Sequence, residues 1–163
     1  MLGCPFADAI LSTGCAVELA HCRYLPRLLQ TSNTRLVSTG LDMAETIAIA
    51  SDHAAFELKA ALVQWLRDEG LEVHDLGPEN ATSVDYPDYG YKLAEAIAAG
   101  EASRGIAMCG SGIGISIAIN RHPAARCALV SEILSAQLAR EHNDANVIAM
   151  GARLIGIEQA KAC

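Results

Sequence analysis

Cys109 is followed directly by Gly110-Ser111-Gly112-Ile113-Gly114, and this joining of a thiol to a glycine-rich loop is the segment best suited to chemistry. The apolar residues before it, 105–109, predict a buried strand, and those after it predict a helix. Amide groups of such a loop and of a helix N-terminus bind anions. A thiol beside them is held more readily as its thiolate, which acts as a base or a nucleophile. The junction therefore predicts an anion site with a reactive group at its edge.

Polar residues also follow two other predicted strands. Asp52 and His53 come directly after the strand expected at 47–50, and Arg153 follows the one expected at 147–150. Asp52 has a structural alternative, because it can cap the next helix, and that role is compatible with contact to a ligand. Arg153 can equally be an ordinary surface cation. Because the carboxyl ends of parallel strands meet at one edge of a sheet, we expect these side chains to converge with Cys109.

Three further candidates lie outside strand ends. His142 ends a predicted helix, where a cation interacting with the helix dipole is the structural alternative. Asn143 beside it extends a polar cluster that a plain helix end does not need. Tyr86 belongs to a segment, 85–89, whose composition predicts a turn, and its ring could close over a site.

Short apolar segments alternate with helical patterns from about residue 43 onward. The expected strands are 47–50, 72–76, 105–109, 126–130 and 147–150, and the expected helices are 56–69, 89–99, 113–120, 132–142 capped by Ser131, and one beginning near Gly156 and still in progress at Cys163. Such alternation predicts an α/β fold with a parallel sheet covered on both faces. With right-handed crossovers it becomes a doubly wound, open five-stranded sheet, a Rossmann-like three-layer sandwich.

The composition narrows the class of protein. A net charge of -7 argues against a nucleic-acid or anionic-membrane surface. The sequence contains neither an apolar run long enough to span a membrane nor a basic segment typical of a secretory signal. Its six cysteines are scattered and form no C-x-x-C pair, which indicates a reducing compartment and hence the cytoplasm. Cys15, His21 and Cys22 match no zinc spacing.

The first part of the chain differs in character from the rest. Residues 1–42 show no clear periodicity, whereas regular alternation starts soon after Met43. We therefore expect two parts, an N-terminal extension over 1–42 and a folded domain over 43–163.

The glycine loop also has to be weighed as a nucleotide site. Gly110 and Gly112 fit the first two positions of G-x-G-x-x-G, but Ile115 stands where the third glycine belongs, and the loop follows the third strand instead of the first. A Walker A loop is excluded because no Gly-Lys-Ser or Gly-Lys-Thr occurs.

Taken together, the motifs resemble ribose-5-phosphate isomerase type B, a family that also includes subunits of galactose-6-phosphate isomerase. The resemblance covers residues 45–163. Its matching segments are Ser51-Asp52-His53-Ala54-Ala55-Phe56, Asp85-Tyr86-Pro87, Cys109 to Ser116, Ser135-Ala136-Gln137-Leu138 and Arg140 to Val147.

The resemblance implies an aldose–ketose isomerase that moves a proton between C2 and C1 of ribose 5-phosphate through an enediolate, in the pentose phosphate pathway of carbohydrate metabolism. Such chemistry needs a positioned base and stabilisation of an oxyanion. Cys109 matches the family's base, Ser111 a hydroxyl that helps to shuttle the proton, and His142 the residue that opens the sugar ring. No metal or cofactor is implied.

The binding residues follow from the same resemblance. Asp52 and Asn143 match positions that bind sugar hydroxyls, and His53 and Arg153 match positions near the phosphate. Tyr86 is expected to border the substrate because of its place in the predicted turn. The family's anion hole matches the amides of Gly110, Ser111, Gly112, Ile113 and Gly114.

The resemblance also implies a homodimer, or a dimer of dimers, in which both subunits line each site. Family members continue with a C-terminal helix that carries arginines for the phosphate, whereas this chain ends at Cys163, partway into that helix. Weakened phosphate binding is the expected consequence. Two alternatives stay open: an isomerase of a hexose 6-phosphate such as galactose or allose 6-phosphate, and a catalytically weak module that binds a sugar phosphate.

Overall fold

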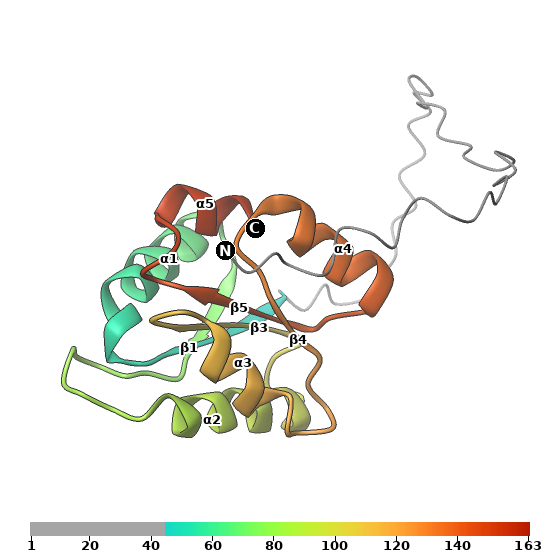
Figure 1. The fold of residues 1–163 in the computed structure, drawn as a ribbon, viewed down its shortest axis with the longest axis horizontal. Coiled ribbons are helices and arrows are strands. Elements are labelled where there is room, and N and C mark those ends of the chain that lie inside the picture. Colours follow the sequence, from blue (N-terminus) through green and yellow to red (C-terminus); the bar gives the residue numbers. More distant parts are fainter. Residues whose placement is uncertain (1–44) are drawn as a thin grey trace, which may run out of the picture. The chain divides into compact units, whose positions relative to one another are not determined.

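The computed structural model describes residues 45–163 (Figure 1). The extension predicted at 1–42 lies outside these residues, so its separation from the domain at 43–163 stays a prediction. Within the described part, strands and helices alternate from one end to the other, as expected. No helix of residues 45–163 is both long and apolar enough to cross a membrane.

A single parallel sheet of five strands forms the centre of this domain. Its strands are β1 (Thr46–Ser51), β2 (Glu72–Asp75), β3 (Arg104–Cys109), β4 (Cys127–Leu129) and β5 (Val147–Gly151). Their order in the sheet is β2-β1-β3-β5-β4. The predicted doubly wound, open sheet is therefore confirmed, because the chain first moves outward to one edge and then crosses β1 to build the other.

Helices cover both faces of the sheet and complete three layers (Figure 1). One face carries α2 (Tyr86–Ala99) and α3 (Ile113–Ile119), and the other carries α1 (Phe56–Asp68), α4 (Ile133–Asn143) and α5 (Ile157–Ala162). Leu93 and Ile115 are fully buried on the first face, and Ile49 and Met150 on the second. The core is thus aliphatic, as the small number of aromatic residues requires.

Two helix starts differ from the prediction. α2 begins at Tyr86, not at Tyr89, so the segment 85–89 is mostly helix rather than turn. Pro87 explains the difference, because proline is tolerated in the first turn of a helix, where its missing N–H is not needed. α4 is capped by Glu132 instead of Ser131, since the Glu132 carboxylate accepts hydrogen bonds from the amides of Leu134 and Ser135.

The buried side of α1 differs from the expected one at two positions. The periodicity predicts that Ala61 faces the core, but Ala61 is exposed, whereas Lys59 is 2% exposed. Leu62 and Leu66 are buried as predicted. A lysine therefore occupies a position in the interior beside the sheet, where its charge needs a partner.

Candidate active site

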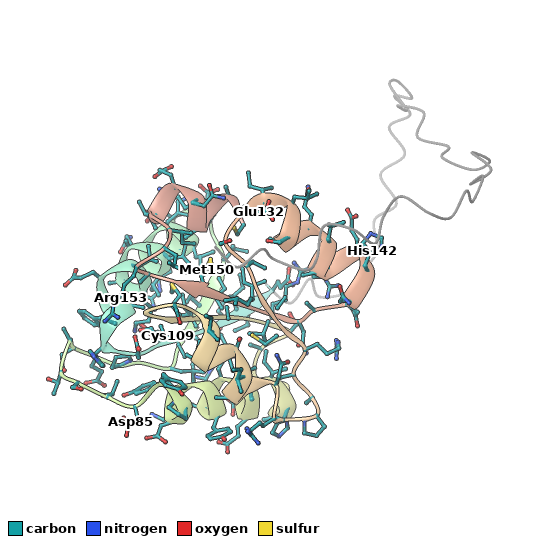
Figure 2. The ribbon with its side chains drawn as sticks, viewed as in Figure 1. Asp85, Cys109, Glu132, His142, Met150 and Arg153 are labelled. Atoms are coloured by element: carbon teal, nitrogen blue, oxygen red, sulfur yellow. The ribbon has the colours of Figure 1, made fainter. Side chains whose placement is uncertain are left out.

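The carboxyl ends of β1 and β3 border an open cavity of about 500 Å³. The connections change direction between these two strands, and ligands of open α/β sheets bind at such points. Nine of the twelve predicted site residues line this cavity, and Cys109 at the end of β3 is among them (Figure 2). The expected convergence at one edge of the sheet is therefore confirmed for most of the set.

The glycine loop holds the Cys109 sulfur in place. Cys109 is 4% exposed, and its Sγ accepts a hydrogen bond from the Gly112 amide at 3.1 Å. The Ile113 amide donates to the Ser111 hydroxyl at 3.3 Å. Both contacts turn the loop on itself, so that sulfur and hydroxyl border the same cavity.

Close packing at Gly112 explains why the loop needs glycine there. Gly112 has φ +78°, a left-handed conformation that other residues adopt only with strain. A Cβ atom at this position would lie 2.8 Å from the carbonyl carbon of Met150 and 2.7 Å from the Leu129 side chain. Gly112 itself is buried and lies beneath the cavity instead of lining it.

The loop is also tied to the neighbouring strand end. The amides of Ala152 and Arg153, which follow β5, donate to the carbonyls of Cys109 and Gly110 at 2.9 and 3.0 Å. The Arg153 guanidinium folds back over Gly110, whose added Cβ would lie 3.3 Å from the guanidinium carbon. A cation is therefore placed beside Cys109 in the cavity (Figure 2), as an anionic substrate requires.

Asp52 and His53 form the β1 side of the cavity. Asp52 is 7% exposed, and its Oδ1 accepts hydrogen bonds from the amides of Ala54 and Ala55 at 2.9 and 3.1 Å. The alternative of a helix cap is therefore confirmed, for the 3₁₀ turn His53–Ala55, and both bonds use the same oxygen. The His53 Nδ1 lies against the backbone of Val84, 3.1 Å from its carbonyl oxygen and 3.2 Å from its nitrogen.

Tyr86, the first residue of α2, borders the cavity on the side of this helix, as predicted for a tyrosine of the segment 85–89. Its ring lies over Gly114, where an added Cβ would be 2.7 Å from the ring carbon that bears the hydroxyl. Ile113 borders the same opening.

His142 and Asn143 lie elsewhere. Both are exposed at the end of α4, which starts beside the carboxyl ends of the strands and returns to their amino ends. Their neighbours Asp144 and Asn146 bond to Arg126, just before β4, which fixes this position. Figure 2 shows His142 far from Cys109. Within one chain the structure therefore does not bring these two residues to the cavity.

The thiols of Cys109 and Cys127 lie in different surroundings. Cys109 borders the cavity, whereas Cys127 on β4 packs against the core beneath α2 and α3. Burial raises the pKa of Cys127 to about 12, so its thiol stays protonated near neutral pH. No group of three or more metal-binding side chains occurs among residues 45–163.

Sequence reasoning missed two participants. Leu154 borders the cavity, and its place directly after Arg153 at the end of β5 could have indicated it. The Val84 backbone holds His53, and no residue type signals a contact made by main-chain atoms alone.

Known proteins resemble this chain throughout the described domain. The family described as Ribose/Galactose Isomerase matches residues 47–163. Ribose-5-phosphate isomerase B of Escherichia coli is 47% identical over 115 residues, which cover 71% of this chain and 77% of that protein. D-erythrulose-4-phosphate isomerase of Pectobacterium atrosepticum is 45% identical over 118 residues, again 71% and 77%. The crystal structure of a ribose 5-phosphate isomerase from Thermotoga maritima is 49% identical, with a TM-score of 0.71 over 72% of this chain and 81% of that one.

Proposed function

This chain belongs to the ribose/galactose isomerase family, and from that membership and its cavity we propose that it interconverts ribose 5-phosphate and ribulose 5-phosphate. As a member of this family it is a sugar-phosphate isomerase. The observation that carries the substrate assignment is the identity of 47% to a ribose-5-phosphate isomerase B, in a chain whose thiol, hydroxyl and cation border one cavity. Its cysteines and the free sugar-phosphate substrate support the cytoplasm and the pentose phosphate pathway as its setting.

In this proposal Cys109 is the base. Its thiolate takes the proton from C2 of the open-chain aldose, and the electron pair moves to the C1 carbonyl, which gives an enediolate with negative charge on O1. Ser111 then carries the hydroxyl proton from O2 to O1, which moves the negative charge to O2. The protonated sulfur returns its proton to C1 while the carbonyl forms at C2, and this completes the ketose.

The glycine loop stabilises the negative oxygen. Of its five amides, those of Gly112 and Ile113 already donate within the loop. We therefore assign the oxyanion to the amides of Gly110, Ser111 and Gly114, where aligned donors lower the barrier most. Asp52, whose two bonds use only Oδ1, offers its other carboxylate oxygen to a sugar hydroxyl.

The phosphate lies between His53 and Arg153 in this proposal. Arg153 donates through a planar fork that suits phosphate oxygens. His53 offers Nε2, because Val84 occupies Nδ1. Tyr86 borders the sugar between these groups and Gly114.

His142 and Asn143 take part from a second copy of the chain. An exposed apolar surface supports assembly, because α3, β4 and α4 present large apolar side chains that a monomer would keep in water. These side chains, with exposed fractions of 39–59%, are Ile113, Ile117, Leu129, Ile133, Leu134 and Leu138. In a homodimer, or a dimer of dimers, that buries this surface, the partner's His142 opens the sugar ring at a cavity bordered by Ile113.

The length of the sugar has a second candidate. The relative named D-erythrulose-4-phosphate isomerase is 45% identical, nearly as similar as the ribose-5-phosphate enzyme, so a four-carbon substrate has the same kind of support. Galactose or allose 6-phosphate is larger, and an open cavity of about 500 Å³ does not exclude either sugar by its size.

A turnover screen decides between these substrates. Purified chain is offered erythrose 4-phosphate, ribose 5-phosphate, galactose 6-phosphate and allose 6-phosphate, and the ketose formed is measured by NMR. Highest kcat/KM on ribose 5-phosphate supports the proposal, and highest kcat/KM on another sugar replaces the substrate. Saturable binding of all four without ketose formation or solvent-deuterium exchange at C2 would leave only a binding module.

A further inference from the structure

Lys59 is a buried cation that the reaction above does not use. It lies on α1 with 2% of its surface exposed, and its Nζ donates to Asp75 Oδ1 at 2.6 Å and to the Pro78 carbonyl at 3.0 Å. Burying an ammonium group is unfavourable unless such partners compensate it. Both partners stand at the end of β2 and the start of the loop that follows, so the charge of Lys59 is directed at this loop.

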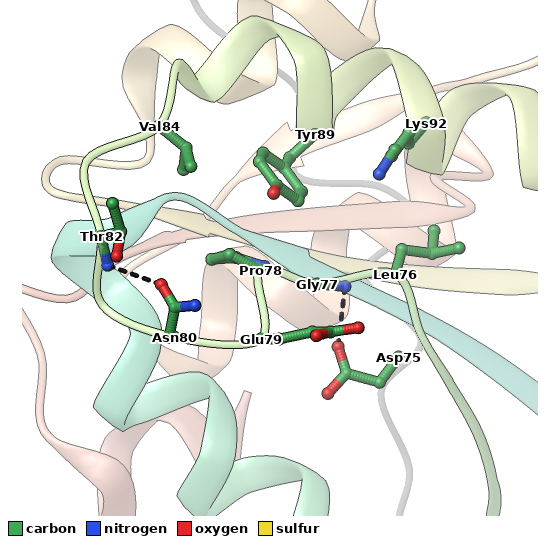
Figure 3. Close-up of a pocket in the computed structure, with 10 residues that line it drawn as sticks. All are labelled: Asp75, Leu76, Gly77, Pro78, Glu79, Asn80, Thr82, Val84, Tyr89 and Lys92. Carbon is green, nitrogen blue, oxygen red and sulfur yellow. Dashed lines mark hydrogen bonds between the residues drawn. The ribbon is translucent and has the colours of Figure 1, made fainter.

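The same contacts tie the loop to the end of β1. Asp75 Oδ1 also accepts from the Gly77 amide at 3.0 Å (Figure 3). The Gly77 carbonyl in turn accepts from the Ser51 amide at 3.1 Å, directly before Asp52 and His53. Through these hydrogen bonds Lys59 connects α1 with the end of β2 and, by way of Gly77, with the last residue of β1.

The loop over residues 76–85 depends on its two ends for its position. Gly77 lies close to the Tyr89 ring of α2, and beyond it the loop borders an open cavity of about 580 Å³ together with Tyr89 and Lys92 of that helix (Figure 3). Residues 79–83 are exposed, and the Thr82 amide bonds within the loop, to Asn80 Oδ1 at 2.9 Å. The middle of the loop is therefore exposed and bonds within itself.

The other end of the loop is where it meets the active site. The Val84 backbone lies against His53 Nδ1 at 3.1 and 3.2 Å, and Tyr86 follows two residues later. A shift of the loop would release the imidazole that we assign to the phosphate. We propose that Lys59 is a positioning residue, whose buried contacts with Asp75 and Pro78 hold this loop so that Val84 fixes His53 for the phosphate. The assignment of the phosphate to His53 rests on the proposed function.

Kinetics of Lys59→Met test the proposal. The substitution keeps the length and volume of the side chain and removes its donors. We expect KM for the sugar phosphate to rise about tenfold, as for a lost charge-assisted contact, with kcat changed less than about twofold. Lys92→Met removes an exposed lysine from the cavity beneath the same loop and is the matched control, with unchanged KM.

A double-variant cycle separates positioning from general destabilisation. If Lys59 acts through His53, Lys59→Met adds nothing to the KM of His53→Ala. Fully additive effects would overturn the proposal. Should Lys59→Met not fold, Val84→Pro removes the amide that faces His53 and must raise KM in the wild type but not in His53→Ala.

Imidazole NMR gives a readout independent of turnover. The signal of His53 is assigned by its loss in His53→Ala, and in Lys59→Met or Val84→Pro we expect it to shift or broaden while the other histidine signals stay in place. An unchanged His53 signal would overturn the positioning role even in an active enzyme. A wild type that isomerises no sugar phosphate would refute the proposed function, while the NMR arm would still decide whether Lys59 positions His53.

Discussion

The Gly112 amide lies 3.1 Å from the Cys109 sulfur and donates a hydrogen bond to it. The loop that offers amides to an oxyanion thus also fixes the position of the base. Cys109 is 4% exposed and one amide donates to its sulfur, so the side chain has little freedom to rotate away from the substrate. Base and oxyanion site are therefore placed together by one short segment, which the chemistry of proton transfer next to a carbonyl needs.

Removal of the thiol should abolish isomerisation. We expect Cys109→Ala to lower kcat at least about a thousandfold, because the proposed reaction assigns removal of the C2 proton to this sulfur. Solvent-deuterium exchange at C2, followed by NMR, should be lost equally. Cys127→Ala removes the partly buried thiol of β4 instead and should keep activity. Exchange that continues at the wild-type rate in a folded Cys109→Ala protein contradicts the role of the sulfur.

Gly112→Ala should destabilise the domain more than Gly100→Ala. Both glycines have left-handed φ, +78° and +74°, so each substitution carries backbone strain of about 1 kcal/mol. A Cβ at Gly100 meets nothing within 4 Å, whereas at Gly112 it would lie 2.8 Å from the Met150 backbone. The comparison of Tm values isolates this close contact. Equal losses of Tm would mean that the loop relaxes freely.

The fold could be predicted from the sequence because its signals are local. Apolar segments such as 147–150, ended by Gly151, mark buried strands, and their alternation with helices implies the parallel sheet. The start of α2 was mistaken because Asp85-Tyr86-Pro87 suits both a turn and the first turn of a helix. Only the following turns, which pack Leu93 on the sheet, decide between the two.

The candidate site could be predicted for those residues that lie at the carboxyl ends of strands, because these ends meet at one edge of a parallel sheet. Asp52 and Arg153 follow strands, Cys109 ends one, and the three converge. His142 lies in the last turn of a helix, and in our proposal it reaches a cavity only in a second chain, which a single sequence does not describe. Lys59 was missed because a lysine on an amphipathic helix usually faces water, and its partner Asp75 is 16 residues away.

Complementation between inactive variants tests the shared site. Cys109→Ala and His142→Ala should each be inactive on the cyclic substrate. Unfolded together in equal amounts and refolded, they should regain about a quarter of wild-type activity, because half of the dimers are mixed and each has one intact site. A control mixture of Cys109→Ala with Ser111→Ala should stay inactive, since both changes affect the same side of the site. No recovery, with mixed dimers demonstrated by mass spectrometry, would place His142 outside the partner's cavity.

The ionised carboxylate of Glu132 should stabilise the folded domain at neutral pH and lose this effect in acid. The Ser135 side chain lowers the pKa of this carboxylate from its ordinary value of 4.5. The Ser135 amide at 2.6 Å and the Leu134 amide at 2.8 Å, which both donate to it, lower the pKa further. A lowered pKa in the folded state means that the contribution is fully present above pH 4.5 and is lost as the pH falls through the folded value. Glu132→Gln should therefore have a lower Tm than wild type at neutral pH, and the difference should shrink in acid. Glu141→Gln, exposed at the other end of α4, is the control. A Tm difference for Glu132→Gln that stays constant down to the most acidic pH at which the wild type folds would show that the charge of this cap is unimportant.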